Sequence, residues 1–268
     1  MILLADLVKE FEKAWPISHA DSWDRVGLCV GSLDQQITKV LIAVDLTSGV
    51  IDEAIEIGAN LIVTHHPLLF KPVDSVTEDK LKGFLLTRLI KQSVALYSAH
   101  TNADVQDDGA STLMAKAFGL EELRPLVVTS SGFGHGVIGS LAKAVSLAEF
   151  SRKVSEALPK VARKVAFSGD PSRQISKVAV CSGAGDSFLP DVLSSDADVY
   201  VTSDLRHHPA LDAVSTPREA GPLALIDVSH WSSESLWVTG ALTKLSTLSG
   251  IEFVASATNT DPWTQEVN

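Results

Sequence analysis

The sequence predicts an α/β fold made of two related, duplicated domains, each with three α/β/α layers around a mixed, mostly parallel sheet. Short β-rich runs alternate with helical patterns along most of the 268 residues, which is typical of parallel strands joined by helices. In addition, the run Ile37–Ile42 recurs as Ile175–Val180, at an offset of 138 residues (175 − 37). The same offset relates Val63-Thr64 to Val201-Thr202, and each dipeptide precedes a His-His-Pro motif, in the second copy after the four inserted residues 203–206.

The predicted strands are short apolar runs that end at polar or turn residues. We expect them at Lys39–Val44, Leu61–Thr64, Ala95–Ser98, Lys177–Cys181, Val199–Thr202 and Leu223–Asp227. The predicted helices are segments in which apolar residues recur every three or four positions. We expect them at Leu3–Trp15, Gly49–Ile57, Asp79–Gln92, Ala110–Phe118, Leu147–Leu158, Pro209–Val214 and Ser233–Leu245. The order of these segments indicates repeated strand–helix–strand units.

A change of domain is expected near Pro125. The stretch Thr129–Gly136 that follows it is rich in glycine and serine and predicts a loop, with His135 as a loop residue. We therefore expect residues 1–126 and 230–268 to form the first domain, which carries most of the metal ligands named below. Residues 127–229 are expected to form the second domain.

The composition predicts a cytoplasmic protein with a well-filled core. Hydrophobic residues make up 45% of the chain, its mean hydropathy is +0.18, and no uncharged apolar run is long enough to span a membrane. Asp6 and Lys9 interrupt the apolar N-terminus, so it reads as an amphipathic helix and not as a signal peptide. Cys29 and Cys181 give no disulfide framework. The net charge of −11 argues against general nucleic-acid binding, which needs a basic face.

The pair His65-His66 stands at the end of the predicted strand Leu61–Thr64 and is followed by Pro67. Side chains alternate along a strand, so neighbouring histidines diverge unless the backbone turns between them. A turn at the carboxyl end of a strand can aim both rings into the crevice where open α/β sheets bind ligands. Two hydrogen-bonded surface histidines are the alternative.

Three further predicted strand ends carry residues of the same kind. They are His100 with Asp104, Asp204 with His207 and His208, and His230 with Glu234. Six of the eight histidines therefore fall at strand ends. Histidine with carboxylate and without cysteine suits Zn²⁺, Mn²⁺, Fe²⁺, Co²⁺ or Ni²⁺, and this number of ligands suits two metal ions bridged by a carboxylate.

Five segments together resemble the Nif-three-like family, whose members are named type 2 GTP cyclohydrolase I homologues. They are Ser22–Leu28, Val63–Pro67, Ala99–Asp104, Thr202–His208 and His230–Glu234. The resemblance covers essentially the full length, in the short form without a central insertion. It implies two divalent metal ions per subunit on His65, His66, Asp104, His230 and Glu234, with Glu234 as the bridge. It also implies a duplicated α/β fold and a ring-shaped homohexamer whose metals face an inner cavity.

Two residues depart from the family pattern. Arg25 stands where many relatives have asparagine, and Ser203 where many have glycine. These departures concern substrate contacts and not metal binding. Arg25 or Arg206 can offset the charge of a phosphate.

Other residues near the motifs have two readings each. Trp23 can stack on a planar base beside the carboxylate of Asp24, or it can be a partly buried tryptophan. His100 can orient a metal ligand or contact substrate, or it can bond to the backbone at a strand end. Trp231 and Trp237 are expected to pack in the core.

The second histidine pair decides between two kinds of function. If the two halves face each other across a cleft, Asp204, His207 and His208 can act as general acid or base beside the metals. Their alternative is an N-cap aspartate with two surface histidines. The first hypothesis is a metal-dependent hydrolase that uses metal-bound hydroxide, and the resemblance implies a guanine nucleotide as substrate, with opening of the imidazole ring at C8. The alternatives are a phosphoesterase with the same centre and a non-catalytic ring that stores, delivers or senses metal.

Overall fold

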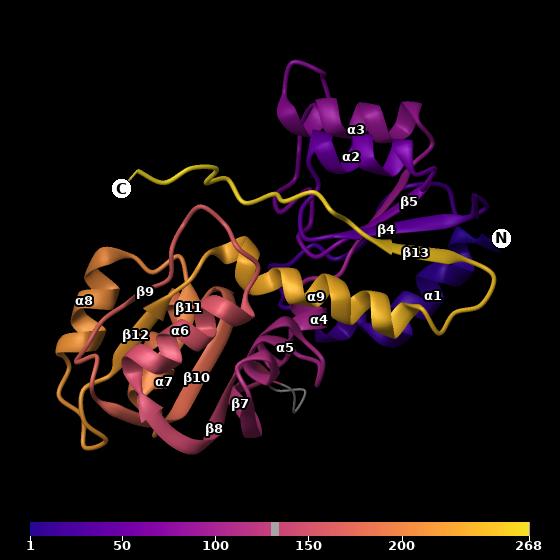
Figure 1. Cartoon of the computed structure of the whole chain (residues 1–268). Helices are drawn as coiled ribbons and strands as arrows, with labels where there is room; N and C mark the ends of the chain where they lie inside the picture. The colour runs from indigo at the N-terminus through magenta and orange to yellow at the C-terminus, as the bar shows by residue number, and fades with distance from the viewer. Residues whose placement is uncertain (130–133, 268) are drawn as a thin grey trace. The chain divides into compact units, whose positions relative to one another are not determined.

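The computed structural model describes residues 1–129 and 134–267 and divides the chain into two compact units (Figure 1). Unit 1 consists of Met1–Gln106 and Trp237–Thr260, and unit 2 of Asp107–Leu236 and Asp261–Asn268. The helix α9 (His230–Leu245) begins in unit 2 and continues in unit 1. The expected boundaries after residues 126 and 229 differ from this division. The strand β7 (Leu120–Val128) pairs with β8 (Gly134–Ser146) in the sheet of unit 2.

Unit 1 is built on a five-stranded, mostly parallel sheet. Its strand order is β13 (Glu252–Ala255), β4 (Lys39–Ala43), β5 (Leu61–Thr64), β6 (Ala95–Ser98) and β2 (Gly27–Val30). The first four strands run parallel, and β2 pairs antiparallel with β6 at the edge. The short strands β1 (Ile2–Leu3) and β3 (Gln36–Ile37) form a separate antiparallel pair. Because β4, β5 and β6 are parallel, their carboxyl ends lie at one edge of this sheet.

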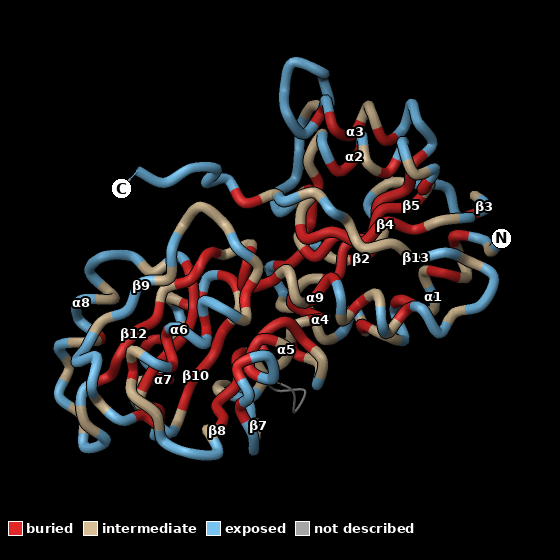
Figure 2. The backbone as a smooth tube through the Cα atoms, viewed as in Figure 1, coloured by how far each residue is buried: buried red, intermediate tan, exposed pale blue. Residues whose placement is uncertain are grey.

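Helices cover both faces of the sheet in unit 1, and its central strands β4, β5 and β6 are buried (Figure 2). The helices α2 (Ser48–Glu56) and α3 (Leu81–Lys91) pack on one face, on Leu41, Ile62 and Leu96. On the other face, Phe11 of α1 (Leu4–Ala14) contacts Tyr97, with ring centroids 5.0 Å apart. The short elements η1 (Ile17–His19) and α4 (Thr101–Asp104) complete this unit.

Unit 2 contains a six-stranded mixed sheet. Its order is β7, β8, β10 (Gln174–Ala184), β11 (Val199–Ser203), β12 (Ala224–Asp227) and β9 (Ala166–Phe167). The central strands β10, β11 and β12 are parallel, and the flanking strands pair antiparallel. The helices α5 (Ala110–Ala117) and α6 (Leu147–Ala157) cover one face. The other face is covered by α7 (Leu189–Leu193), which directly follows η2 (Asp186–Phe188), and by α8 (His207–Ser215).

The two units repeat the same strand register, which supports the predicted duplication. Val40 pairs with Leu61 between β4 and β5, and Val178 pairs with Val199 between β10 and β11. Both partners are shifted by 138 residues. In each unit a third parallel strand follows, and a short antiparallel strand lies beside it. The predicted α/β class with mixed sheets and helices on both faces is confirmed.

The prediction of a loop over Thr129–Gly136 is wrong for the last residues of that stretch. Residues 130–133 lie outside the described residues, but β8 begins at Gly134. A Cβ at Gly134 would overlap Pro125 and the carbonyl oxygen of Val127 on β7, so this glycine lets the two strands approach closely. His135 is therefore a strand residue, and its ring stacks on Phe188 with centroids 5.7 Å apart.

Two helices begin earlier than expected, and both changes affect the histidine motifs. The helix α8 starts at His207 and not at Pro209, and α9 starts at His230 and not at Ser233. Proline is tolerated anywhere in the first helical turn, so Pro209 does not mark the first residue. None of the described helices is long and apolar enough to cross a membrane.

The carboxylate of Glu53 on α2 holds the segment that follows β13. It accepts hydrogen bonds from Ser256 Oγ at 2.5 Å, Thr258 Oγ1 at 2.7 Å and the Ala257 amide at 2.7 Å. Burial alone would raise the pKa of Glu53, but these hydrogen bonds outweigh burial and hold the pKa below its usual value of 4.5. A lowered carboxylate pKa gives stability that is present above pH 4.5 and is lost as the pH falls through the folded-state pKa.

We therefore expect Glu53→Gln to lower the free energy of unfolding by about 1 kcal/mol at pH 7 and by much less at an acid pH below the folded-state pKa of Glu53, where the wild-type carboxylate is protonated. Urea unfolding at the two pH values measures this difference. Glu56→Gln, an exposed change on the same helix, is the control and should stay within about 0.5 kcal/mol of the wild type. If Glu53→Gln lowered the free energy of unfolding equally at both pH values, the charge of Glu53 would not be what stabilises this segment.

Candidate metal centre

His65 and His66 follow β5, and a backbone turn brings their rings together as predicted. The amides of both residues continue the β-sheet pairing by donating to Ala43 and Val44, while Thr64 Oγ1 donates to the carbonyl oxygen of His66 at 2.8 Å. The two ring centroids lie 5.2 Å apart. His65 is fully buried, and His66 keeps 16% of its side chain exposed.

Hydrogen bonds fix the tautomers of these two rings. His65 Nδ1 donates to the carbonyl oxygen of Ala99 at 3.0 Å, and a carbonyl oxygen can only accept. His66 Nδ1 donates to Asp45 Oδ1 at 2.7 Å. In the neutral rings, the lone pair therefore lies on Nε2, as it does in metal-bound histidines that are oriented by an outer carboxylate or carbonyl group.

His100 joins this pair in unit 1. Its ring centroid lies 5.1 Å from that of His65 and 5.3 Å from that of His66. One ring nitrogen from each of the three histidines lies within 4.8 Å of the other two, so the group could hold a metal ion. Asp104, at the end of α4, adds a carboxylate oxygen 3.6 Å from His65 Nε2.

The buried carboxylate of Asp24 orients His100. Asp24 Oδ2 accepts from His100 Nδ1 at 3.0 Å, from Thr101 Oγ1 at 2.6 Å and from the Thr101 amide at 3.0 Å. Burial alone would raise the pKa of Asp24, but these hydrogen bonds and the charge of His100 hold it well below its usual range. Asp24 is therefore ionised and keeps the Nδ1 proton on His100.

Two exposed aromatic rings flank His100. Trp23 is 55% exposed and Phe70 is 43% exposed. Both rings meet His100 edge to face, with centroid distances of 5.9 Å and 5.6 Å. Phe70 also lies 6.4 Å from His66. Exposed aromatic faces beside polar groups are suited to stacking on a planar ligand.

Trp237 is buried, as predicted for a core residue, but it also shapes the site in unit 1. It is 2% exposed, and its ring centroid lies 5.6 Å from that of Trp15 and 4.9 Å from that of His65. Arg25, for which a phosphate contact is predicted, lies in the turn beside Asp24. Its guanidinium donates to the carbonyl oxygen of Asp24 at 2.7 Å, so it braces the Trp23-Asp24 turn.

His230 and Glu234 form the second part of the predicted ligand set, on the first turns of α9 in unit 2. His230 Nε2 lies 3.1 Å from Glu234 Oε2, as expected for residues four apart on one helix face. His230 Nδ1 donates to Asp204 Oδ2 at 2.7 Å. Asp204 thus acts on His230 as Asp45 acts on His66.

Gly183 makes room for the Glu234 carboxylate. Its φ of +64° suits glycine, and a Cβ at this position would overlap the carboxylate of Glu234. The Gly183 amide donates to Ser233 Oγ at 2.8 Å, and its carbonyl oxygen accepts from Thr202 Oγ1 at 3.2 Å. The histidines and carboxylates of both units thus offer the donor atoms that divalent transition metals bind.

The second histidine pair is not joined to this group. His207 and His208 begin α8, are exposed, and contact each other with ring centroids 5.1 Å apart. Within the described residues, no hydrogen bond, ion pair or ring contact links them to His230 or Glu234. Arg206 pairs with Asp186, with Nε 2.8 Å from Oδ2, and keeps 77% of its side chain exposed.

Asp45 and Phe70 were not predicted from the sequence. Asp45 lies two residues after β4. Its position at a strand end could have indicated a site residue, as it did for His65 and His66. Phe70 lies outside the helices and strands, and no pattern in the sequence indicates it.

Known proteins match the chain over nearly its whole length. Residues 2–262 match the family described as Duf34/NIF3 (NGG1p interacting factor 3). A Streptomyces coelicolor protein named GTP cyclohydrolase 1 type 2 homolog is 38% identical, over 98% of this chain and 94% of its own. A Clostridium perfringens protein of the same name is 33% identical, over 97% and 98% of the two chains.

Solved structures agree with this match. A hypothetical protein of Staphylococcus aureus superposes with a TM-score of 0.87 at 30% identity and covers 99% of both chains. A Bacillus cereus protein related to NIF3 shares the fold, with a TM-score of 0.89 at 24% identity over 98% of this chain and 99% of its own. The chain therefore belongs to the DUF34/NIF3 family.

Proposed function

We propose that this protein is a metal-dependent hydrolase with a dinuclear centre that acts on a guanine nucleotide. The ligands in this proposal are the five that the family resemblance implies, namely His65, His66, Asp104, His230 and Glu234, with Glu234 as the bridge. The name GTP cyclohydrolase 1 type 2 homolog, carried by relatives such as the Streptomyces coelicolor protein, supports the choice of nucleotide. The ring-shaped homohexamer implied by the family resemblance is part of the same proposal.

The observation that carries the proposal is the common anchoring of four histidines. His65, His66, His100 and His230 each place Nδ1 on an oxygen acceptor, at distances of 2.7–3.0 Å. Each neutral ring therefore keeps the lone pair of Nε2 for a metal ion. In three of the four rings, the oxygen that accepts from Nδ1 belongs to a carboxylate. Structural histidines do not need this uniformity, whereas a metal centre does, because outer groups must fix both tautomer and orientation.

Bound divalent metals supply Lewis acidity and lower the pKa of a coordinated water. The other steps fall to side chains of this protein. Trp23 and Phe70 hold the flat base beside His100. Arg206, which stays largely exposed, contacts phosphate. His207 and His208 move protons, and Asp204 keeps His230 in its metal-binding tautomer.

The ligand assignment predicts that single substitutions remove metal. We expect His66→Ala and Asp104→Ala to lower the metal content of the purified protein by at least about half, because loss of a ligand or an outer partner typically costs 10–100-fold in affinity. Elemental analysis by mass spectrometry measures the content. His19→Ala, which removes a histidine that lies outside the cluster, should keep the full amount. Full metal content in both ligand variants would show that the assignment is wrong.

The hydrolase proposal predicts turnover of GTP by the metal-loaded protein. We expect Glu234→Ala to abolish turnover and to lose metal. His208→Ala should keep its metal and lose about 10²-fold or more in kcat, the usual contribution of a general acid or base. Product formation can be followed by chromatography. If the metal-loaded protein and His208→Ala are equally active, His208 has no catalytic role, and if neither turns over GTP, a metal-binding scaffold becomes the better account.

The aromatic pair predicts a defect in base binding. Phe70→Ala and Trp23→Ala should each raise KM for GTP about tenfold with little change in kcat, since stacking of a base on an aromatic ring contributes about 1–3 kcal/mol. Phe70→Tyr keeps the ring and should behave like the wild type. Steady-state kinetics separates the two parameters. A fall in kcat at unchanged KM would argue against stacking.

A further inference from the structure

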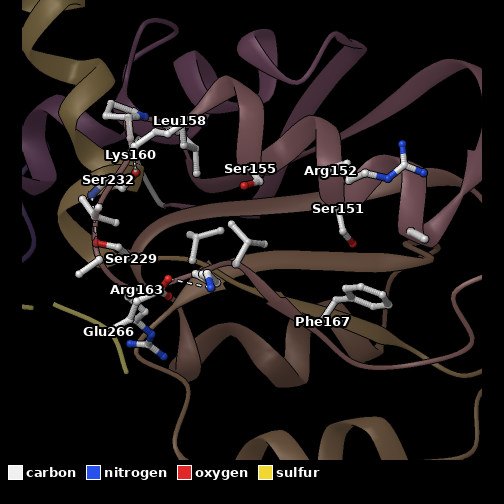
Figure 3. Close-up of a pocket in the computed structure, with 17 residues that line it drawn as sticks. Ser151, Arg152, Ser155, Leu158, Lys160, Arg163, Phe167, Ser229, Ser232 and Glu266 are labelled. Atoms are coloured by element: carbon white, nitrogen blue, oxygen red, sulfur yellow. Dashed lines mark hydrogen bonds and ion pairs between the residues drawn. The ribbon is translucent and has the colours of Figure 1, made fainter. Parts of the chain in front are cut away.

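A cavity in unit 2 is lined by none of the proposed metal ligands. Its volume is about 490 Å³, within the range of small-molecule sites. The helix α6, the loop between residues 159 and 165, Phe167 of β9 and the first turn of α9 form its walls (Figure 3). All of these segments belong to one compact unit.

The lining of this cavity is basic in an otherwise acidic chain. Four cations line it, namely Arg152, Lys160, Arg163 and Lys164, against one carboxylate, Glu266. The whole chain carries a net charge of −11. A concave surface with one sign of charge raises the local concentration of ions of the opposite sign. This cavity therefore attracts anions, although the protein as a whole repels them.

Two of the four cationic side chains already form ion pairs with carboxylates. Arg163 pairs with Asp227, and Lys164 Nζ lies 2.7 Å from Glu266 Oε1. Arg152 and Lys160 make no ion pair with any residue that the structure describes. The cavity thus has two cations available to a ligand.

Glu266 indicates where the anionic group of a ligand would lie. It comes from the C-terminal segment and places its carboxylate in the cavity beside Lys164. The side chains of Lys164 and Glu266 are 69% and 39% exposed, and an ion pair this exposed contributes little to stability. An external anion can therefore replace Glu266 at small cost.

The two ends of the cavity differ in character. Figure 3 shows Lys160, Arg163 and Glu266 at one end and Arg152 with Phe167 at the other. The Phe167 ring is 41% exposed and offers a flat apolar face. Ser155 lies between the two ends and adds an exposed hydroxyl group.

We propose that this cavity binds an organic phosphate of about the size of a mononucleotide. The phosphate lies between Lys160 and Lys164 and takes the place of the Glu266 carboxylate. The ring of the ligand lies on Phe167 beside Arg152. The site is separate from the proposed metal centre and does not depend on it.

The test uses the full chain after removal of metal with a chelator, so that phosphate cannot bind through metal. Isothermal titration calorimetry with AMP, and with adenosine as the uncharged probe, measures binding. We expect AMP to bind and adenosine to bind at least about tenfold more weakly, because adenosine lacks the phosphate that forms charge-assisted hydrogen bonds with Lys160 and Lys164. Absence of AMP binding, or equal binding of the two probes, would overturn the proposal.

Neighbouring residues of α6 provide a matched control. Arg152 lines the cavity, whereas Lys153 is also exposed but does not. Arg152→Ala and Lys160→Ala should each weaken AMP binding about fivefold or more, and Lys153→Ala should leave it unchanged. Glu266→Gln should strengthen binding, because it removes the competing carboxylate. An equal effect of Lys153→Ala would mean that only the general charge of the surface attracts AMP and would refute a built site.

Discussion

The candidate metal centre depends on one constraint, which is that each histidine must give its Nδ1 proton to a fixed oxygen. The acceptors come from chain positions at or near the ends of strands: Asp45 follows β4, Ala99 follows β6, and Asp204 follows β11. Parallel strand order brings such ends to one edge of each sheet. The register of the sheets therefore decides which nitrogen of each ring is available, and with it what the site can bind.

The duplication explains why the two histidine pairs differ. At the 138-residue offset, His65 corresponds to Ser203, His66 to Asp204, and Asp45 to Gly183. Ser203 donates to the Gly183 carbonyl, and Asp204, at a φ of +55°, reaches His230. In the second copy, residues at the positions of the proposed ligands instead position a proposed ligand, His230, or its neighbours. The second His-His-Pro motif begins four residues after Ser203, at the start of α8.

Much of the fold could be predicted because each central strand is a short apolar run between turn residues. The partners within the site could not, because they are far apart in the chain: Asp24 lies 76 residues from His100, and Ala99 lies 34 from His65. Only the strand order brings them together. The loop prediction at Gly134 was wrong for a local reason. Glycine occurs both in loops and where two strands approach closely, and the neighbouring residues do not distinguish a loop from a strand here.

The distribution of charge supports two sites with different ligands. In unit 1, Asp24, Asp45 and Asp104 lie against His100, His66 and His65, and in unit 2, Asp204 and Glu234 lie against His230. Such a concentration of carboxylates is unfavourable unless protons or cations offset it. The cavity beside α6 has the opposite balance and contains a carboxylate of the chain itself. A single ligand cannot satisfy both environments at once, because one requires positive charge and the other negative charge. Cations at the histidines and an anion in the cavity therefore complete the same uneven distribution of charge.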